Sequence, residues 1–290
     1  MNRSTYTAVK RVQTLRARRL NFRNLGLSQV PPGVTHVRQL EVLDLRENHL
    51  ETLPDDLGQL TRLQELYLDQ NRFSALPARL GHLTSLRTLT LGHNQLTRLP
   101  NELGQLVNLY HLAVWSNRLS AVPAALSRLS ALRSLYLGQN ELEQLPAALR
   151  QLTSLQTLDL SQNRFATFPA VLAHLPRLTA LRLTANRLSS LPATLGQLSR
   201  LRHLDLGANQ LETLPESLGQ LTHLTTLNLA GNQLTILPEW VAHLPNLFHL
   251  DLRHNPRLCG LPPGLRVHRV TAIGCPYLID MPAAVREVVR

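Results

Sequence analysis

The sequence predicts a solenoid, a coil of about twelve similar units in which short strands alternate with tight turns. The first observation is a set of asparagines that recur every 23 residues. The second is the apolar spacing L-x-x-L-x-L before each asparagine, and the third is the spacing L-P-x-x-L-x-x-L after most of them. Self-similarity at a fixed period of this length indicates a repeat architecture. The asparagines are Asn48, Asn71, Asn94, Asn117, Asn140, Asn163, Asn186, Asn209, Asn232 and Asn255.

The unit at residues 132–154 illustrates how each part is expected to fold. Leu135 and Leu137 alternate with other residues, as in a short strand that points its leucines into the core. Asn140 then ends the strand in a turn, where its amide can bond to backbone groups that the turn leaves unpaired. The leucines spaced three apart after Pro146 suit a short 3₁₀ or α turn. We therefore expect a ladder of asparagine hydrogen bonds from coil to coil.

The pattern L-x-x-L-x-L-x-x-N-x-L-x-x-L-P resembles the leucine-rich repeat family over residues 17–288. The resemblance implies an α/β fold, a right-handed solenoid curved like a horseshoe. A parallel β-sheet would line the concave face, with 3₁₀ or short helical turns and extended segments on the convex face. The 23-residue form is similar to the intracellular type found in Ras-suppressor-like, plant Ras-related and many bacterial repeat proteins. That type binds other proteins and has no chemistry of its own.

The two ends of the chain depart from the repeat. Residues 1–16 are expected to be a basic capping segment, with a basic arm that docks on an acidic partner or a membrane surface as the alternative. Residues 17–288 are expected to form a single solenoid whose last units are degenerate, with Cys275 buried in an asparagine place. Residues 283–290 are expected to form a short helical tail.

The charge distribution argues against a general nucleic-acid binder. The formal net charge is +11, but residues 1–40 hold eight basic and no acidic residues, which leaves the repeats close to neutral. The sequence contains no apolar run long enough for a transmembrane helix and no secretory signal pattern. Two cysteines do not indicate a disulfide framework. We therefore expect a cytoplasmic monomer, or alternatively a translocated bacterial effector, with a protein as its partner.

The sequence carries no motif for catalysis. It has no Gly-rich phosphate loop, no H-E-x-x-H, no paired C-x-x-C and no G-x-S-x-G. The histidines fall in repeat places that intervening units hold too far apart to share one ion. We therefore expect no metal ion, no cofactor and no enzymatic activity.

The variable residues of the strands are the candidates for recognition, because the repeat determines the other positions. Neighbouring strands lie about 4.8 Å apart, so residues at matching places of successive units are neighbours. One region is aromatic, and we expect Gly92 and Gly138 to leave room there for Trp115. It is predicted to be a binding hot spot, and the alternative is that Trp115 only fills the surface above its small neighbours. The region comprises Tyr67, His93, His111, Trp115 and Tyr136.

A second region is a polar ladder of Asp159, Arg182 and Asp205, with His203 beside it. These charges on adjacent strands are expected either to contact a partner or simply to pair with one another. We predict that the chain is a non-catalytic scaffold or adaptor that binds a protein on the concave face. The alternative is a regulatory or targeting segment of a larger signalling enzyme or bacterial effector, and attachment to nucleic acid or membrane through residues 1–23 is a third.

Overall fold

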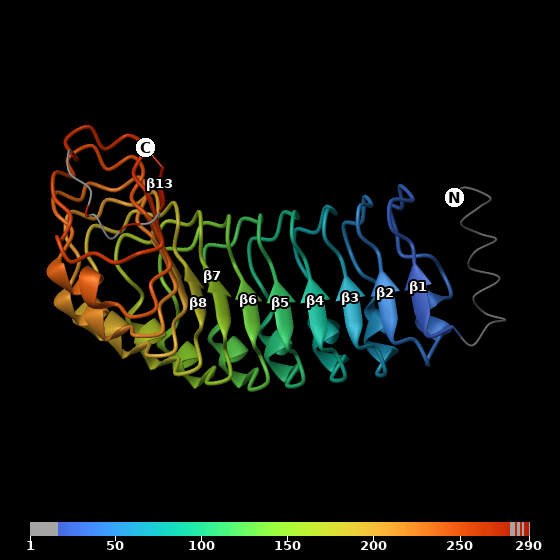
Figure 1. Ribbon diagram of the computed structural model, residues 1–290. Coiled ribbons are helices and arrows are strands. Elements are labelled where there is room, and N and C mark those ends of the chain that lie inside the picture. Colours follow the sequence, from blue (N-terminus) through green and yellow to red (C-terminus); the bar gives the residue numbers. More distant parts are fainter. Residues whose placement is uncertain (1–16, 279–281, 283–284, 286, 290) are drawn as a thin grey trace. The chain divides into compact units, whose positions relative to one another are not determined.

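A computed structural model describes residues 17–278, 282, 285 and 287–289 (Figure 1). The expected capping segment, residues 1–16, lies outside the described residues. The chain divides into two compact units, one up to residue 142 and one from residue 143 onward. Both are built from the same alternation of a three-residue strand with a 3₁₀ turn, which confirms the predicted solenoid architecture.

In the first unit, six strands pair in parallel and in chain order. Each residue lies opposite the one 23 positions later, as Leu43 does with Leu66. The strands are β1 (Arg19–Asn21), β2 (Val42–Asp44), β3 (Glu65–Tyr67), β4 (Thr88–Thr90), β5 (His111–Ala113) and β6 (Ser134–Tyr136). The 3₁₀ turns between them are η1 (Val34–His36), η2 (Asp55–Gln59), η3 (Ala78–His82), η4 (Asn101–Gln105) and η5 (Ala124–Arg128).

The second unit repeats this order, and its strands also pair in parallel. Its strands are β7 (Thr157–Asp159), β8 (Ala180–Arg182), β9 (His203–Asp205), β10 (Thr226–Asn228), β11 (His249–Asp251), β12 (Arg269–Thr271) and β13 (Glu287–Val289). Its 3₁₀ turns are η6 (Ala147–Gln151), η7 (Ala170–His174), η8 (Ala193–Gln197), η9 (Glu216–Gln220) and η10 (Glu239–His243).

The chain end differs from the expectation of a helical tail over residues 283–290. Residues Glu287–Val289 form strand β13, which pairs in parallel with β12. The β12 edge offers unpaired backbone groups, and the β-branched Val288 and Val289 favour a strand over a helix. The helical prediction is therefore wrong at these three residues.

The core of each unit is a stack of aliphatic side chains between the sheet and the 3₁₀ turns. Leu43, Leu66 and Leu89 on successive strands are completely buried. The turns also stack closely, because a Cβ atom on Gly104 of η4 would lie only 2.3 Å from the carbonyl oxygen of Ala125 in η5. The recurring glycines thus let successive turns approach.

The asparagine ladder is confirmed. The buried Asn94 accepts a hydrogen bond from the backbone N–H of Phe73 at 3.1 Å. Its amide nitrogen donates to the carbonyl oxygens of Leu68 and Leu91, each at 3.0 Å. One side chain thus joins its own coil to the preceding one.

One backbone conformation recurs beside the ladder, and no single residue type marks it in the sequence. The residue directly before each asparagine place takes a positive φ, as do His93 (φ 53°) and Ala208 (φ 50°). This left-handed conformation costs an L-residue about 1–2 kcal/mol. It is retained because it turns the chain out of the strand and brings the asparagine into the core.

Candidate functional site

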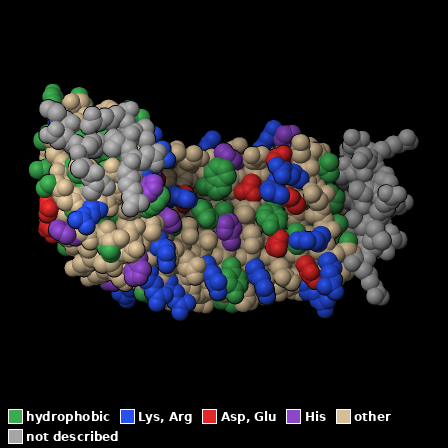
Figure 2. All heavy atoms as spheres, viewed as in Figure 1, with side chains coloured by type: hydrophobic (Ala, Val, Ile, Leu, Met, Phe, Trp, Pro, Cys, Tyr) green, Lys and Arg blue, Asp and Glu red, His purple; other side chains and the backbone are tan. Residues whose placement is uncertain are grey.

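The candidate site lies on the outward face of the first unit's sheet, opposite the buried leucines. Each strand of this unit buries its middle residue, and most flanking residues stay at least partly accessible, as Glu65 and Tyr67 are on β3. The exceptions are Asp44 on β2 and Ala113 on β5, which are buried. Figure 2 shows hydrophobic, histidine and acidic side chains interspersed on this face over β3 to β6. We call Tyr67, His93, His111, Trp115 and Tyr136 the aromatic patch.

Trp115 is the largest side chain of the patch, and 36% of its surface is exposed. Its indole ring lies on Gly92 of the preceding coil, so close that a Cβ atom there would be 2.5 Å from the indole nitrogen. The imidazole of His93 packs edge-on against the ring, with centroids 4.2 Å apart. The expectation that Gly92 makes room for Trp115 is therefore met.

Two further rings of the patch form a second pair. His111 on β5 and Tyr136 on β6 have ring centroids 5.2 Å apart and planes tilted by 48°. Burial lowers the pKa of His111, and the nearby charge of Asp69 partly opposes that effect. His111 is therefore held mainly as the neutral imidazole near neutral pH.

Asp69 belongs to this site although the sequence did not single it out. Its carboxylate accepts hydrogen bonds from the backbone N–H of Gly92 at 2.8 Å and from the hydroxyl of Thr90. No ion pair among the described residues involves it. The sequence feature that could have identified Asp69 is its position, which follows strand β3 and lies one repeat before Gly92.

Tyr67 belongs to neither of the two ring pairs that the other members of the patch form. Its hydroxyl donates to Glu65 at 2.8 Å, and the guanidinium of Arg46 lies 4.9 Å from its ring centroid. Burial, followed by the bond to Glu65, raises the pKa of Tyr67 to about 12. Tyr67 therefore acts as a neutral hydrogen-bond donor over the whole physiological range.

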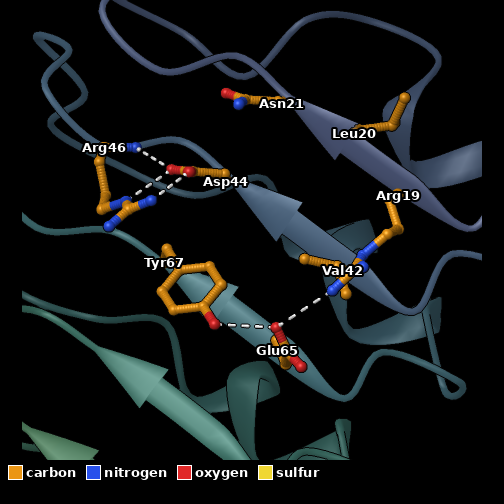
Figure 3. Close-up of a pocket in the computed structure, with 8 residues that line it drawn as sticks. All are labelled: Arg19, Leu20, Asn21, Val42, Asp44, Arg46, Glu65 and Tyr67. Atoms are coloured by element: carbon orange, nitrogen blue, oxygen red, sulfur yellow. Dashed lines mark hydrogen bonds and ion pairs between the residues drawn. The ribbon is translucent and has the colours of Figure 1, made fainter.

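Tyr67 lines a hollow of about 390 Å³ over β1 to β3 (Figure 3). The guanidinium of Arg46 donates two hydrogen bonds, of 2.9 and 2.6 Å, to the carboxylate of the buried Asp44 there. Burial alone would raise the pKa of Asp44, but the hydrogen bonds and charge of Arg46 outweigh it, so the pKa is lowered. The hollow is lined by Arg19, Leu20, Asn21, Val42, Asp44, Arg46, Glu65 and Tyr67.

The polar ladder expected in the second unit is only partly paired. Arg182 and Asp159 form an ion pair at 3.7 Å. Asp205 accepts instead from the side-chain amide of Asn228 at 2.8 Å and from the backbone of Gly207. His203 reaches Thr226 at 3.3 Å. Among the described residues, Arg182 thus has one acidic partner.

Neither a metal site nor a membrane-spanning helix is found in the part of the chain that the structure describes. No three His, Cys, Asp or Glu side chains gather there as metal ligands. None of the described helices has the length and apolar content needed to span a bilayer. The Cys275 thiol is buried and donates to the carbonyl of Leu252 at 3.1 Å. Burial raises the pKa of this thiol, which suits a structural role.

The lowered pKa of His111 predicts acid sensitivity of the first unit. Below about pH 6.5 the unfolded chain takes up a proton at His111 more readily than the folded chain does, so stability falls as pH falls. We expect His111→Gln to flatten this decline, measured by urea unfolding at neutral and mildly acidic pH. His36→Gln, at an exposed position, serves as the control. An unchanged pH slope in His111→Gln would contradict the assignment.

Two family models match the chain. The model described as "Leucine-rich repeat region" matches residues 2–122. The model described as "Leucine rich repeat" matches residues 107–165, 176–234 and 212–256. No curated protein gives a significant match.

Solved structures match over most of the chain. A leucine-rich repeat protein from Leptospira interrogans is 31% identical, with a TM-score of 0.74, and the match covers 91% of this chain and 80% of that one. The ectodomain of the Arabidopsis thaliana membrane receptor kinase GASSHO1/SCHENGEN3, in complex with CASPARIAN STRIP INTEGRITY FACTOR 2, is 30% identical (TM-score 0.74; 93% and 38% coverage). A plant peptide hormone receptor, RGFR1, in complex with RGF2, is 26% identical (TM-score 0.76; 91% and 46%). The chain thus spans less than half of either receptor structure.

Proposed function

Because this chain belongs to the leucine-rich repeat family, whose fold typically serves as a protein-interaction scaffold, we propose that it is a non-catalytic scaffold that binds a protein partner. The partner occupies the outward face of the sheet, which we expect to be concave. The aromatic patch anchors the partner. Polar contacts help to orient it, and they come from Asp159, Arg182, His203 and Asp205.

The exposed indole of Trp115 is the observation that supports this proposal most. Its ring is supported from beneath by Gly92 and from the side by His93, so it is held in place before a partner arrives. A rigid aromatic surface loses little conformational entropy on binding, which is why such residues dominate interface energies. Asp69 adds a carboxylate that forms no ion pair among the described residues, so a hydrogen-bond donor of the partner could bind it.

Capture of a partner from a lysate of the native host, with wild-type protein and the double variant Trp115→Ala, Tyr136→Ala, tests the proposal. For a captured protein, we expect Trp115→Ala alone to weaken the Kd by roughly 30-fold, which corresponds to about 2 kcal/mol. Tyr277→Ala serves as the control, because Tyr277 is 65% exposed but lies outside the patch. Equal affinity of wild type and of a folded double variant would refute the anchor.

A second candidate function is a regulatory or targeting segment of a larger signalling enzyme or effector. It is favoured by the receptor-kinase ectodomain, a piece of a larger protein, of which the chain spans only 38%. Co-purification with an enzyme whose activity changes on addition of this chain would support it. An isolated scaffold would leave the activity of any captured enzyme unchanged.

We also propose that the protein is a cytoplasmic monomer that does not bind nucleic acid. Fractionation of the native host and light scattering of the purified chain test the location and the mass. Recovery outside the cytoplasm, or a dimer mass at micromolar concentration, would contradict the proposal.

A further inference from the structure

A second surface of the first unit lies along the edge where its strands begin. In each coil a segment runs from the last residue of the 3₁₀ turn to the residue before the strand. The five segments together hold five arginines and one acidic residue, Glu41, whereas the whole chain holds 30 basic and 19 acidic residues. Positive charge is thus concentrated on this edge. The segments are residues 36–41, 59–64, 82–87, 105–110 and 128–133.

Backbone contacts bring three of these segments side by side. The N–H of Tyr110 donates to the carbonyl of Arg87 at 2.8 Å, and the N–H of Arg133 donates to the carbonyl of Tyr110 at 2.9 Å. The side chain of Asn108 donates to the carbonyl of Thr84 at 2.9 Å. Arg87 and Arg133 therefore flank Tyr110, and the guanidinium of Arg133 lies 5.1 Å from its ring centroid.

This surface combines accessible apolar side chains with unpaired cations. Tyr110 is 40% exposed and Val107 is 46% exposed. The arginines are exposed too, and none takes part in an ion pair among the described residues. Figure 2 shows basic side chains spaced along the lower edge of the molecule beneath β1 to β6. We define the basic edge as Arg62, Arg87, Arg128 and Arg133 together with Val107 and Tyr110.

We propose that the basic edge binds an acidic segment of a protein that also carries apolar side chains. Each guanidinium presents a fork of donors that fits a carboxylate, and four unpaired guanidinium groups attract several carboxylates at once. Tyr110 and Val107, set among the arginines, offer contact to apolar side chains. That mixture suits an acidic peptide better than a uniformly charged phosphate backbone. The proposal concerns a surface separate from the aromatic patch and does not depend on it.

Fluorescence anisotropy with a short labelled peptide of Glu, Asp and Leu tests the proposal on the full chain. We expect the double variant Arg87→Glu, Arg133→Glu to weaken the Kd by at least ~10-fold. The variant loses two attractive charges and puts in their place two carboxylates that repel the acidic peptide. Tyr110→Ala is expected to weaken it by ~5-fold.

The control is the double variant Arg72→Glu, Arg118→Glu, which changes the net charge equally. Arg72 and Arg118 are exposed and each directly follows an asparagine of the ladder, beyond the strand. We expect less than ~2-fold weakening, because these charges lie away from the basic edge. Circular dichroism would check that all variants fold.

Three results would overturn the proposal. An equal loss in the control variant would show attraction by net charge alone. Equal binding of a peptide of Gln, Asn and Leu would show that acidic groups are not recognised. Tighter binding of a single-stranded oligonucleotide, or of phosphatidylserine vesicles, would assign the edge to another class of partner.

Discussion

Replacing Asn94 by Leu is expected to lower the free energy of unfolding by about 3 kcal/mol. The change leaves the N–H of Phe73 without its side-chain partner. It also removes one of two asparagine donors from the carbonyls of Leu68 and Leu91, which keep their hydrogen bonds from Asn71 and Asn117. Each buried group left unsatisfied costs about 1–3 kcal/mol. Urea denaturation measures the loss. We expect the cost to be high because the leucine side chain fills the site and keeps water from replacing the amide.

Two further variants test the cause of this loss. Asn94→Cys should lose less than Asn94→Leu, because a thiol can donate one bond, as Cys275 does to Leu252. Gln95→Leu, at the exposed neighbouring position, should change stability by no more than about 0.5 kcal/mol. Equal stability of Asn94→Leu and wild type would refute the ladder as a stabilising element.

Replacing Gly104 by Ala is expected to lower the free energy of unfolding by about 2–3 kcal/mol. The new methyl group would lie 2.3 Å from the backbone oxygen of Ala125, so η4 and η5 must separate. Separation loosens packing between the coils that carry the aromatic patch. Thermal and urea unfolding measure the effect.

The control for this variant is Ser127→Ala, in the corresponding place of the next turn. Ser127 already carries a Cβ atom, so its truncation should be nearly neutral. In the second unit Gly196→Ala should behave like Gly104→Ala, because its Cβ would lie 2.2 Å from the carbonyl oxygen of Ser217. A neutral Gly104→Ala would mean that the turns can separate without cost.

The repeat predicted the fold well because its side chains themselves carry the structural roles. Leu135 and Leu137 are buried where the alternation places them, and Asn140 bonds the preceding coil through the backbone of Leu119. The left-handed residues escaped prediction because that backbone conformation is occupied by side chains as different as Glu47, Gln70 and His93.

The candidate site was predicted less completely, since strand spacing gives neighbours but not the direction in which long side chains lean. Trp115 leans back onto Gly92, whereas Tyr67 turns toward Arg46 and Glu65. Likewise Arg182 forms its ion pair with Asp159, while Asp205 accepts a hydrogen bond from Asn228. In each case the contact depends on the conformation of a long side chain and on the residue beside it, which the repeat pattern does not predict.

The emission of Trp115 tests the central claim, that the aromatic patch is where a partner binds. The chain has two tryptophans, and Trp240 is buried with an indole N–H that has no hydrogen-bond partner, so Trp240→Phe should be tolerated. In that variant Trp115 is the only tryptophan. Titration with the captured partner is predicted to give a saturable blue shift as the indole leaves water. Emission that stays unchanged through saturation of the complex would contradict the claim.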